Sequence, residues 1–526
     1  METEASKHEK KSNMRKTAHL IRYLFLAVLV GLYGWLIISD SVPVIGFAIL
    51  SVLAIAYRLF GGRFGIPSQL DFQALMLLGL ASLSLFWVGN RELAIPKFYG
   101  LLLGLLSFYF ILTFIKHKAA LRLPVLALIV MALVLSVFGL ISNPTLLRLD
   151  FVRSLLALFP QLQNWLSAGG GELINPNSLA GAISFFPPLL VSLLWDNDSY
   201  YKAFLRATEA KKRKNSYKIL LVFALFLTLL VLLLTGSRGA ILGTFAGILL
   251  VACVRDKRIL KISLILLGVG LVVGGFFFRN DFVQLINSSD INADLPTLQY
   301  RSEIWNYSLR LIRDFPITGV GLDNFDSVLR GLYFYQTDIF RVRYIAHSHN
   351  TFLAVAVELG LPALILFSSL IASFFAMAFY NWKHSGSLRR VISLGLAAGM
   401  LAFLIFGVMD AFTLGKNLGI FFWIYLGLMA AVHSLNFTDQ KRKARAQISW
   451  VKAFGHLGIW LGLWLLGVLL SVSLANYNTL FAVLLAIMLG LLLGVLMINR
   501  WNKMVLPVEE EAGKLKVFDK ENEREA

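Results

Sequence analysis

Long stretches of apolar residues, recurring along almost the whole chain, constrain its fold more than any other feature. Runs such as 218–235 and 477–499 consist almost entirely of apolar side chains and are long enough to cross the hydrocarbon core of a bilayer. Of the 526 residues 58% are hydrophobic and only 15% are charged, whereas a soluble chain has about 25% charged residues. These runs exclude a soluble enzyme, and they exclude disorder outside the termini.

Within lipid, a helix satisfies its own backbone hydrogen bonds, and no water is present to do so instead. We therefore predict an all-α integral membrane protein with about 14 transmembrane helices. The expected spans are 20–39, 42–60, 72–89, 98–115, 123–142, 175–195, 218–235, 239–254, 260–278, 349–380, 390–409, 413–434, 453–474 and 477–499.

The distribution of basic residues predicts how these helices are oriented. The chain has a formal net charge of +19, which in a soluble protein would suggest a nucleic-acid partner. If alternate connections are assigned to the cytoplasm, starting with the N-terminal tail, 36 of the 49 Lys and Arg residues lie on that side. This bias is the positive-inside rule, so we expect cytoplasmic N- and C-termini, contact with membrane lipids, and no nucleic-acid partner.

The same topology divides the chain into segments. We expect a cytoplasmic basic tail at 1–19, helices 1–9 at 20–278, an extracytoplasmic loop with amphipathic helices at 279–346, and helices 10–12 at 347–434. A cytoplasmic basic linker at 435–452, an additional helix pair at 453–499 and a cytoplasmic charged tail at 500–526 complete the chain.

The long loop carries candidate binding residues. Ile304, Tyr307, Leu311 and Phe315 recur at helical spacing and predict an amphipathic helix. The basic residues of the loop are all arginines, and guanidinium groups match phosphate oxygens two at a time. Three of them, Arg301, Arg310 and Arg313, lie on or next to this helix. Solvated surface charge is the alternative for most of them.

The loop also contains a Gly-x-Gly turn at Gly319 and Gly321. A lone Gly-x-Gly is weak evidence for phosphate binding, and no Lys-Ser/Thr pair follows it here. Backbone flexibility is therefore the favoured interpretation of this turn.

Two histidines, His347 and His349, stand where the loop re-enters the membrane. A neutral histidine there is suited to accept a proton near pH 7, although a structural hydrogen bond is an alternative role for His347. No third ligand lies at metal-binding spacing in the outer segments, so we expect no metal site. His347 and Glu358 are 11 residues apart, about 16 Å along a straight helix, and cannot form a hydrogen-bonded pair within one.

Three further charged residues lie at or within the expected spans: Arg238, Glu358 and Asp410. Charges at such positions are costly and by default paired or functional. Snorkelling to the interface is the alternative for Arg238.

Over about residues 160–435, the sequence resembles the O-antigen ligase/polymerase superfamily of bacterial membrane glycosyltransferases. The resemblance is carried by several short motifs that follow one another in the order typical of that superfamily. The motifs are Asn175-Pro-Asn177, Gly236-Ser-Arg238-Gly239, Arg301 with Trp305, Gly319-Val-Gly-Leu-Asp-Asn-Phe325, His347-Ser-His349-Asn350 and Glu358-Leu-Gly-Leu-Pro362. Each is weak alone, whereas the ordered set is fairly specific.

The resemblance implies transfer of a glycan from an undecaprenyl-diphosphate donor to a hydroxyl of a glycan or lipid acceptor outside the cytoplasmic membrane, without metal, nucleotide or other cofactor. It implies that His349, the histidine followed by Asn350, is the general base. Arg238 and Arg301, with Arg310 or Arg313, would bind the diphosphate. Asn177, Asn350, Glu358 and Asp410 are expected in supporting roles.

The acceptor remains open at this stage. A ligase would move a finished glycan, as in lipopolysaccharide assembly, whereas a polymerase would join lipid-linked repeat units by the same chemistry. A small-solute transporter, for example of inorganic carbon, is a third hypothesis. It predicts broken helices with ionisable groups at the bilayer midplane.

Overall fold

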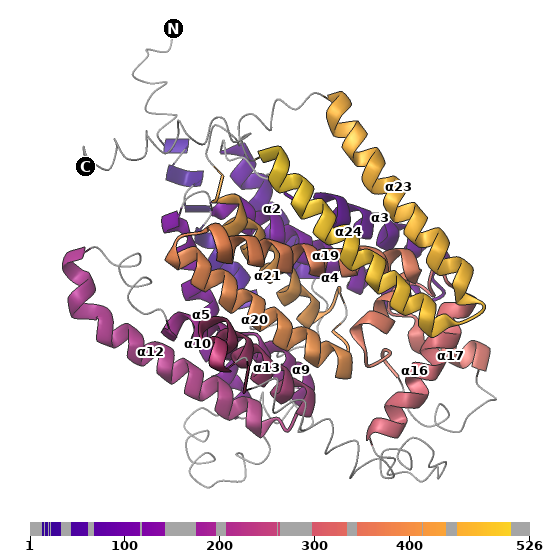
Figure 1. The fold of residues 1–526 in the computed structure, drawn as a ribbon, viewed down its shortest axis with the longest axis horizontal. Coiled ribbons are helices and arrows are strands. Elements are labelled where there is room, and N and C mark those ends of the chain that lie inside the picture. The colour runs from indigo at the N-terminus through magenta and orange to yellow at the C-terminus, as the bar shows by residue number, and fades with distance from the viewer. Residues whose placement is uncertain are drawn as a thin grey trace.

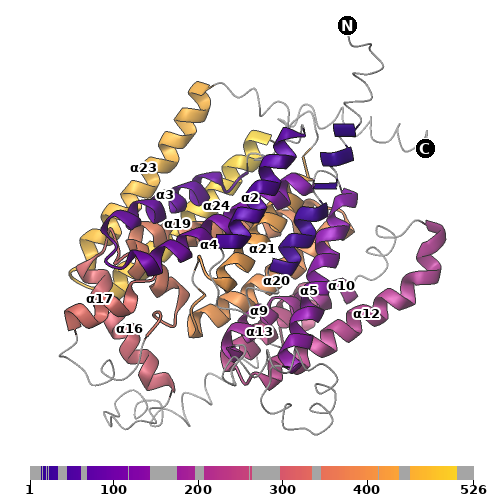
Figure 2. The same cartoon turned by 180° about the vertical axis from the view of Figure 1, so that it is seen from behind.

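The computed structural model describes an all-helical protein (Figures 1 and 2). The described residues are 13–32 without 15, 19 and 22, then 44–60, 68–115, 118–141, 175–195, 207–259, 261–262, 297–333, 345–412, 414–437 and 450–505. Outside these ranges lie the expected span 260–278, apart from residues 261–262, and the tails before residue 13 and after residue 505.

Nine helices in the described ranges are long and apolar enough to cross a membrane, so the chain is a multi-pass membrane protein. Three shorter apolar helices, Val44–Leu59, Asp71–Trp87 and Leu418–Ser434, coincide with further predicted spans. The helices are α2 (Val44–Leu59), α3 (Asp71–Trp87), α4 (Arg91–Phe114), η1 (Lys118–Leu121), α5 (Arg122–Ile141), α9 (Pro176–Ser184), α10 (Phe186–Trp195), α12 (Ala207–Leu234), α13 (Arg238–Arg255), α16 (Thr297–Asp314), α17 (Phe325–Tyr333), α19 (Thr351–His384), α20 (Ser387–Met409), α21 (Asn417–Ser434), α23 (Trp450–Ala475) and α24 (Thr479–Val505).

The helices are arranged around α19, α20 and α21, while α12 and α23 lie on the flanks in both views (Figures 1 and 2). Nearly every side chain of α19 is buried, down to Phe374 and Met377 in its last third. By contrast, α23 exposes Leu469 (68%) and Leu466 (53%), as expected for a helix that faces lipid.

Small residues let the central helices approach closely. A Cβ atom on Gly243 of α13 would lie 2.2 Å from the carbonyl oxygen of Ala402 on α20, and one on Gly247 would lie 2.5 Å from that of Ala398. Such contacts are typical of helix packing in membranes. They hold the first residues of α13 beside the last residues of α20, which is where the candidate site lies.

The predicted amphipathic helix of the loop is present as α16. Ile304, Tyr307 and Leu311 are buried, and they pack in a second hydrophobic core with Leu353 of α19 and Ala486 of α24. Figure 1 places α16 and the short α17 together at one end of the bundle, next to α24. The loop helices are therefore packed onto the helix bundle through an apolar face.

One predicted span departs from a straight helix. The span expected at 349–380 is α19, which contains non-helical backbone at Gly360 (φ 79°, ψ 176°), followed by Pro362. The hydropathy pattern does not show this break, because the residues on both sides of it are apolar. It divides α19 into a short first part and a long second part.

Candidate functional site

A short segment, residues 345–350, leads from the loop helices into α19 and carries both histidines. The buried backbone N–H of Ile345 donates to Asp326 of α17 at 2.9 Å. At the other end, the side chain of Asn350 accepts from the N–H groups of Phe352 and Leu353, which caps α19. The segment is thus held at both ends, and the bundle end that it occupies is called the His349 end below.

His349 lies between these anchors in the left-handed region, with φ 47°. Residues other than glycine rarely adopt this conformation, which costs free energy and is often found at functional sites. The amide of Asn350 also donates to the carbonyl oxygen of Val408, at 3.1 Å, and so ties this turn to the end of α20.

The ring of His349 is oriented by Asp410, the residue that follows α20. Its Nδ1 lies 2.9 Å from Oδ1 of Asp410, and both side chains are partly exposed, at 26% and 13%. Burial raises the pKa of the Asp410 carboxyl, but the hydrogen bond from His349 and the nearby charges, including that of Arg301, outweigh burial, so its pKa is lowered. An ionised carboxylate only accepts hydrogen bonds, so Nδ1 of His349 carries a proton, and in the neutral tautomer the lone pair is then on Nε2.

His347 is placed differently. Its Nδ1 lies 3.2 Å from the backbone nitrogen of His349, from which it accepts a hydrogen bond. Burial, followed by the neighbouring charges of His349, Lys97 and Lys416, lowers the pKa of His347 to about 3. His347 is therefore a neutral ring that supports the turn of His349, in agreement with the structural alternative considered for it.

Of the three predicted loop arginines, Arg301 is the one that lies near this pair. It is close enough to Asp410 to lower the pKa of its carboxyl, and the ring of the preceding Tyr300 has its centroid 6.2 Å from that of His349. Arg310 and Arg313 lie about 14 and 18 Å further along the axis of α16. Arg310 stacks on Tyr307 and Arg313 pairs with Asp314, so both belong to the other end of the helix.

Arg238 is the first residue of α13 and is exposed. A Cβ atom on Gly239 would meet the side chain of Met409, which precedes Asp410, at 3.0 Å. The contact between α13 and α20 therefore brings Arg238 to the His349 end, from a position 111 residues earlier in the chain.

Asn177 lies in the first turn of α9. Its backbone N–H donates to the side chain of Asn175, which caps α9. The Asn175-Pro-Asn177 motif therefore starts a helix, and Asn350 likewise acts as a helix cap.

The Gly-x-Gly turn fits into the break of α19. Val320 and Gly321 donate their N–H groups to the carbonyl oxygens of Val357 and Glu358, at 2.8 and 3.0 Å, and Leu361 donates to Pro316 at 2.8 Å. The backbone groups left free at the break are thus bonded to the loop. The glycines of this turn adopt positive φ angles and allow close backbone approach.

Gly319 and Gly360 show how close this approach is. Gly319 has φ +63°, and a Cβ atom on it would lie 2.4 Å from the carbonyl carbon of Glu358. Gly360 has φ +79°, and a Cβ atom on it would lie 2.2 Å from the carbonyl oxygen of Ile317. Only glycine fits without displacing main chain at either position.

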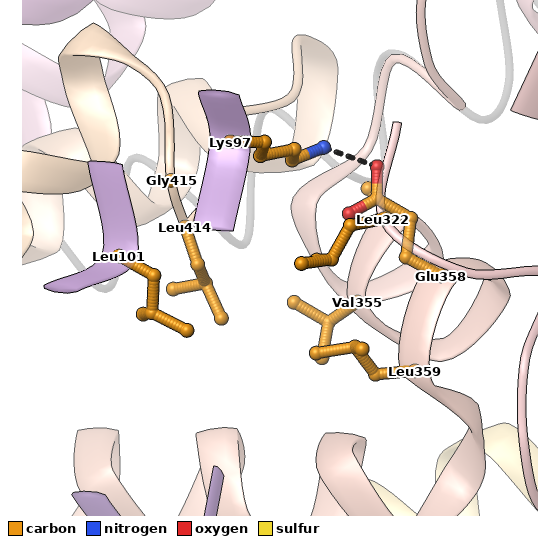
Figure 3. Close-up of a pocket in the computed structure, with 9 residues that line it drawn as sticks. Lys97, Leu101, Leu322, Val355, Glu358, Leu359, Leu414 and Gly415 are labelled. Atoms are coloured by element: carbon orange, nitrogen blue, oxygen red, sulfur yellow. Dashed lines mark hydrogen bonds and ion pairs between the residues drawn. The ribbon is translucent and has the colours of Figure 1, made fainter. Parts of the chain in front are cut away.

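A cluster of four charged residues lies beside this docked turn: Lys97, Asp323 and Glu358 are buried, and Lys416 is 45% exposed. Lys97 of α4 contacts Glu358 of α19, and its Nζ is 3.5 Å from Asp323 of the turn. Asp323 in turn accepts from Lys416, at 2.9 Å. Figure 3 shows the Lys97–Glu358 pair at the edge of a small pocket lined by Leu101, Leu322, Val355, Leu359 and Leu414.

Sequence reasoning identified Glu358 but missed its partners. Lys97 directly precedes the predicted span 98–115 and so falls outside it, although it lies inside α4 with its side chain only 1% exposed. The sequence did contain a signal for both lysines, because the predicted topology places Lys97 and Lys416 on the extracytoplasmic side, where basic residues are few.

His347, His349 and Asp410 could also hold a metal ion, since their ligand atoms all lie within 4.8 Å of one another. The expectation that no third ligand is near the histidines was wrong, because Asp410, 61 residues after His349, meets them in space. Two features disfavour a cation at this position. The His349–Asp410 hydrogen bond already uses two of the ligand atoms, and the positive charges of Lys97, Lys416 and Arg301 act on this group.

The family comparison bears directly on this region. A family model described as O-antigen ligase matches residues 223–368. These residues are an O-antigen ligase domain. The ligase domain runs from α12 to the middle of α19 and contains Arg238, Arg301, His349 and Glu358, whereas Asp410, Lys97 and Lys416 lie outside it. A domain of this family implies a glycosyltransferase-type enzyme with lipid-linked glycan substrates. No curated protein matches the chain.

Proposed function

We propose that this protein transfers a glycan from an undecaprenyl-diphosphate donor to an acceptor hydroxyl at the outer face of the bacterial cytoplasmic membrane. The observation that carries the proposal is the hydrogen bond between His349 of the ligase domain and Asp410, with Arg301 and the first residue of α13, Arg238, nearby. We assign His349 the role of general base, and we assign the diphosphate clamp to Arg238 and Arg301.

In the proposed reaction, the acceptor hydroxyl attacks the anomeric carbon of the donor sugar. Its proton passes to Nε2 of His349, and Asp410 stabilises the imidazolium that forms. The bond between the anomeric carbon and the diphosphate oxygen breaks, and the electron pair leaves with undecaprenyl diphosphate. The two guanidinium groups stabilise the charge that develops there. A single displacement inverts the anomeric configuration, and none of its steps needs a metal or another cofactor.

The direct test is transfer by the purified protein in liposomes that contain an undecaprenyl-diphosphate-linked glycan and an acceptor. Arg301→Ala and Arg238→Ala are each expected to lower the rate of release of undecaprenyl diphosphate by about 10²-fold, because each removes a charged donor aimed at the leaving group. Arg255→Ala is the matched control, since it removes an exposed arginine at the opposite end of α13. Full rates in both Arg301→Ala and Arg238→Ala would overturn the assignment of the clamp.

Asp410→Asn is expected to slow transfer by about 10²–10⁴-fold, because asparagine neither fixes the tautomer of His349 nor stabilises its cation. Since the folded-state pKa of Asp410 is lowered, its contribution is present above the ordinary pKa of an aspartate and is lost as the pH falls through the lowered value. The unfolding transitions of wild type and Asp410→Asn, measured from pH 3 to pH 8, should therefore differ most near neutral pH and approach each other toward the acid end. A variant that transfers at the wild-type rate at pH 7 would contradict the role of Asp410.

Ligase and polymerase share this chemistry and differ in the acceptor. Mass analysis of membrane glycans after deletion separates them, since loss of a polymerase leaves single repeat units and loss of a ligase leaves polymer that is not attached.

The broken helix α19 and its buried ion pair are features that a transporter would also have. In this structure, however, the protein's own loop fills the break and pairs its charges. Uptake of labelled bicarbonate by liposomes that carry the purified protein, lost in Glu358→Gln, would favour transport over transfer.

A further inference from the structure

The four-residue cluster of Lys97, Asp323, Glu358 and Lys416 joins separate parts of the chain at the break of α19. Glu358 lies on the first part of α19, seven residues after its start. Asp323 lies on the turn that follows α16, Lys97 on α4, and Lys416 directly before α21. Lys97 is the centre of the cluster, because its ammonium group approaches both carboxylates.

We propose that Lys97 is a positioning residue for the transfer reaction: by pairing with Glu358 and Asp323, it holds the turn after α16 in the break of α19 and so sets the distance between Arg301 and His349. This inference rests on the proposed function for its kinetic consequence, whereas its structural consequence can be measured without any transfer.

The connectivity supports this role. Arg301 lies on α16, and the turn that docks in the break begins two residues after this helix ends, at Pro316. His349 lies two residues before the first part of α19 begins. The docked turn therefore joins α16, which carries Arg301 of the proposed clamp, to α19, which follows the proposed base His349, through backbone hydrogen bonds.

The burial of the cluster supports it as well. The side chains of Lys97, Glu358 and Asp323 are only 1%, 6% and 8% exposed, so each charge depends on its partners in place of water. Gly415 contributes to this packing, because a Cβ atom on it would lie 1.9 Å from the carbonyl oxygen of Lys97. The segment that carries Lys416 is thus pressed against the main chain of α4.

The cluster is electrically balanced, with two lysines and two carboxylates, and this allows a test that separates positioning from folding. Lys97→Met alone leaves Glu358 buried without its partner, so this variant is expected to fold poorly. The double variant Lys97→Met/Glu358→Gln removes one charge of each sign and leaves the Lys416–Asp323 pair, at 2.9 Å, in place. We expect the double variant to regain most of the thermal stability that Lys97→Met loses.

The distance is measured by double electron–electron resonance between spin labels. The single cysteine, Cys253, is first replaced by serine, and labels are attached at Asn306 on α16 and Val408 on α20, both of which are exposed. The labelled protein must keep the wild-type rate of transfer. The double variant is expected to broaden the distance distribution, and its kcat is expected to fall about tenfold to hundredfold with a nearly unchanged KM for the donor.

Gln73→Met is the matched control. Gln73 of α3 is also buried and donates to Ser369 and Ser373, which lie on the second part of α19, beyond the break. Its loss should leave both the distance distribution and kcat at the wild-type values.

A double variant with the wild-type distance distribution and wild-type kcat would overturn the inference, as would equal broadening in Gln73→Met. If the wild-type protein transfers no glycan, the proposed function fails, yet the distance distribution still tests whether Lys97 positions α16.

Discussion

His349→Asn is expected to lower the rate of glycan transfer by about 10²–10⁴-fold, the contribution typical of a general base. Asparagine is the informative substitution because His349 has φ 47°, a left-handed conformation that asparagine tolerates better than most residues other than glycine. The variant should therefore keep the turn while it loses the basic nitrogen. The measurement is the single-turnover rate of release of undecaprenyl diphosphate by purified protein in liposomes.

His347→Asn supplies the comparison. Its side-chain oxygen can still accept the hydrogen bond from the backbone N–H of His349 that Nδ1 of His347 accepts at 3.2 Å. We expect His347→Asn to stay within about tenfold of wild type, because the pKa of His347, lowered to about 3, makes this ring a poor base near pH 7. A larger loss in His347→Asn than in His349→Asn would reverse the assignment of the base.

Gly360→Ala is expected to destabilise the protein by about 3–5 kcal/mol, the largest effect on stability that we expect for a single methyl group. The φ of +79° and ψ of 176° at Gly360 belong to a region that is essentially restricted to glycine. The added Cβ atom would also lie 2.2 Å from the carbonyl oxygen of Ile317 and 2.6 Å from its carbon, both of which are backbone atoms. Relief of this contact requires the docked turn to leave the break of α19.

The measurement is thermal unfolding in detergent, followed by fluorescence-detected size exclusion. Gly458→Ala is the matched control, since Gly458 lies in α23 and a Cβ atom on it meets nothing within 4 Å. In a helix the exchange of glycine for alanine is worth up to about 1 kcal/mol in favour of alanine. Equal stability of Gly360→Ala and wild type would show that the turn does not depend on this contact.

The two predictions concern the two ends of one short helical stretch. His349 stands before the first residue of α19, and Gly360 ends its first part. The segment between them is capped by Asn350, bonded to the turn after α16, and paired through Glu358 to Lys97. The proposed base therefore stands on a helical stretch that is held at both ends, as precise proton transfer requires.

Much of the site could be predicted from the sequence. Arg301 and His349 were expected in the loop and at its re-entry, and the structure places both at the His349 end. Arg310 and Arg313 were expected to bind the diphosphate together with Arg301, but the structure does not place them at this end, because nine and twelve helical residues separate them from Arg301. Asp410 was expected in a supporting role, but its pairing with His349 was not predicted.

Hydropathy by itself determined that this chain is an all-helical, multi-pass membrane protein, because a lipid-facing segment must satisfy its backbone groups locally and reveals its length in its own residues. The ordered motifs likewise indicated the ligase family from local sequence. Only the tertiary structure showed the His349–Asp410 pair and the Lys97–Glu358 pair, whose members are 61 and 261 residues apart. The break at Gly360 also needed the structure, since the groups that fill it come from a loop some 40 residues earlier in the chain. Such contacts depend on how helices pack, and helix packing leaves no period in the sequence.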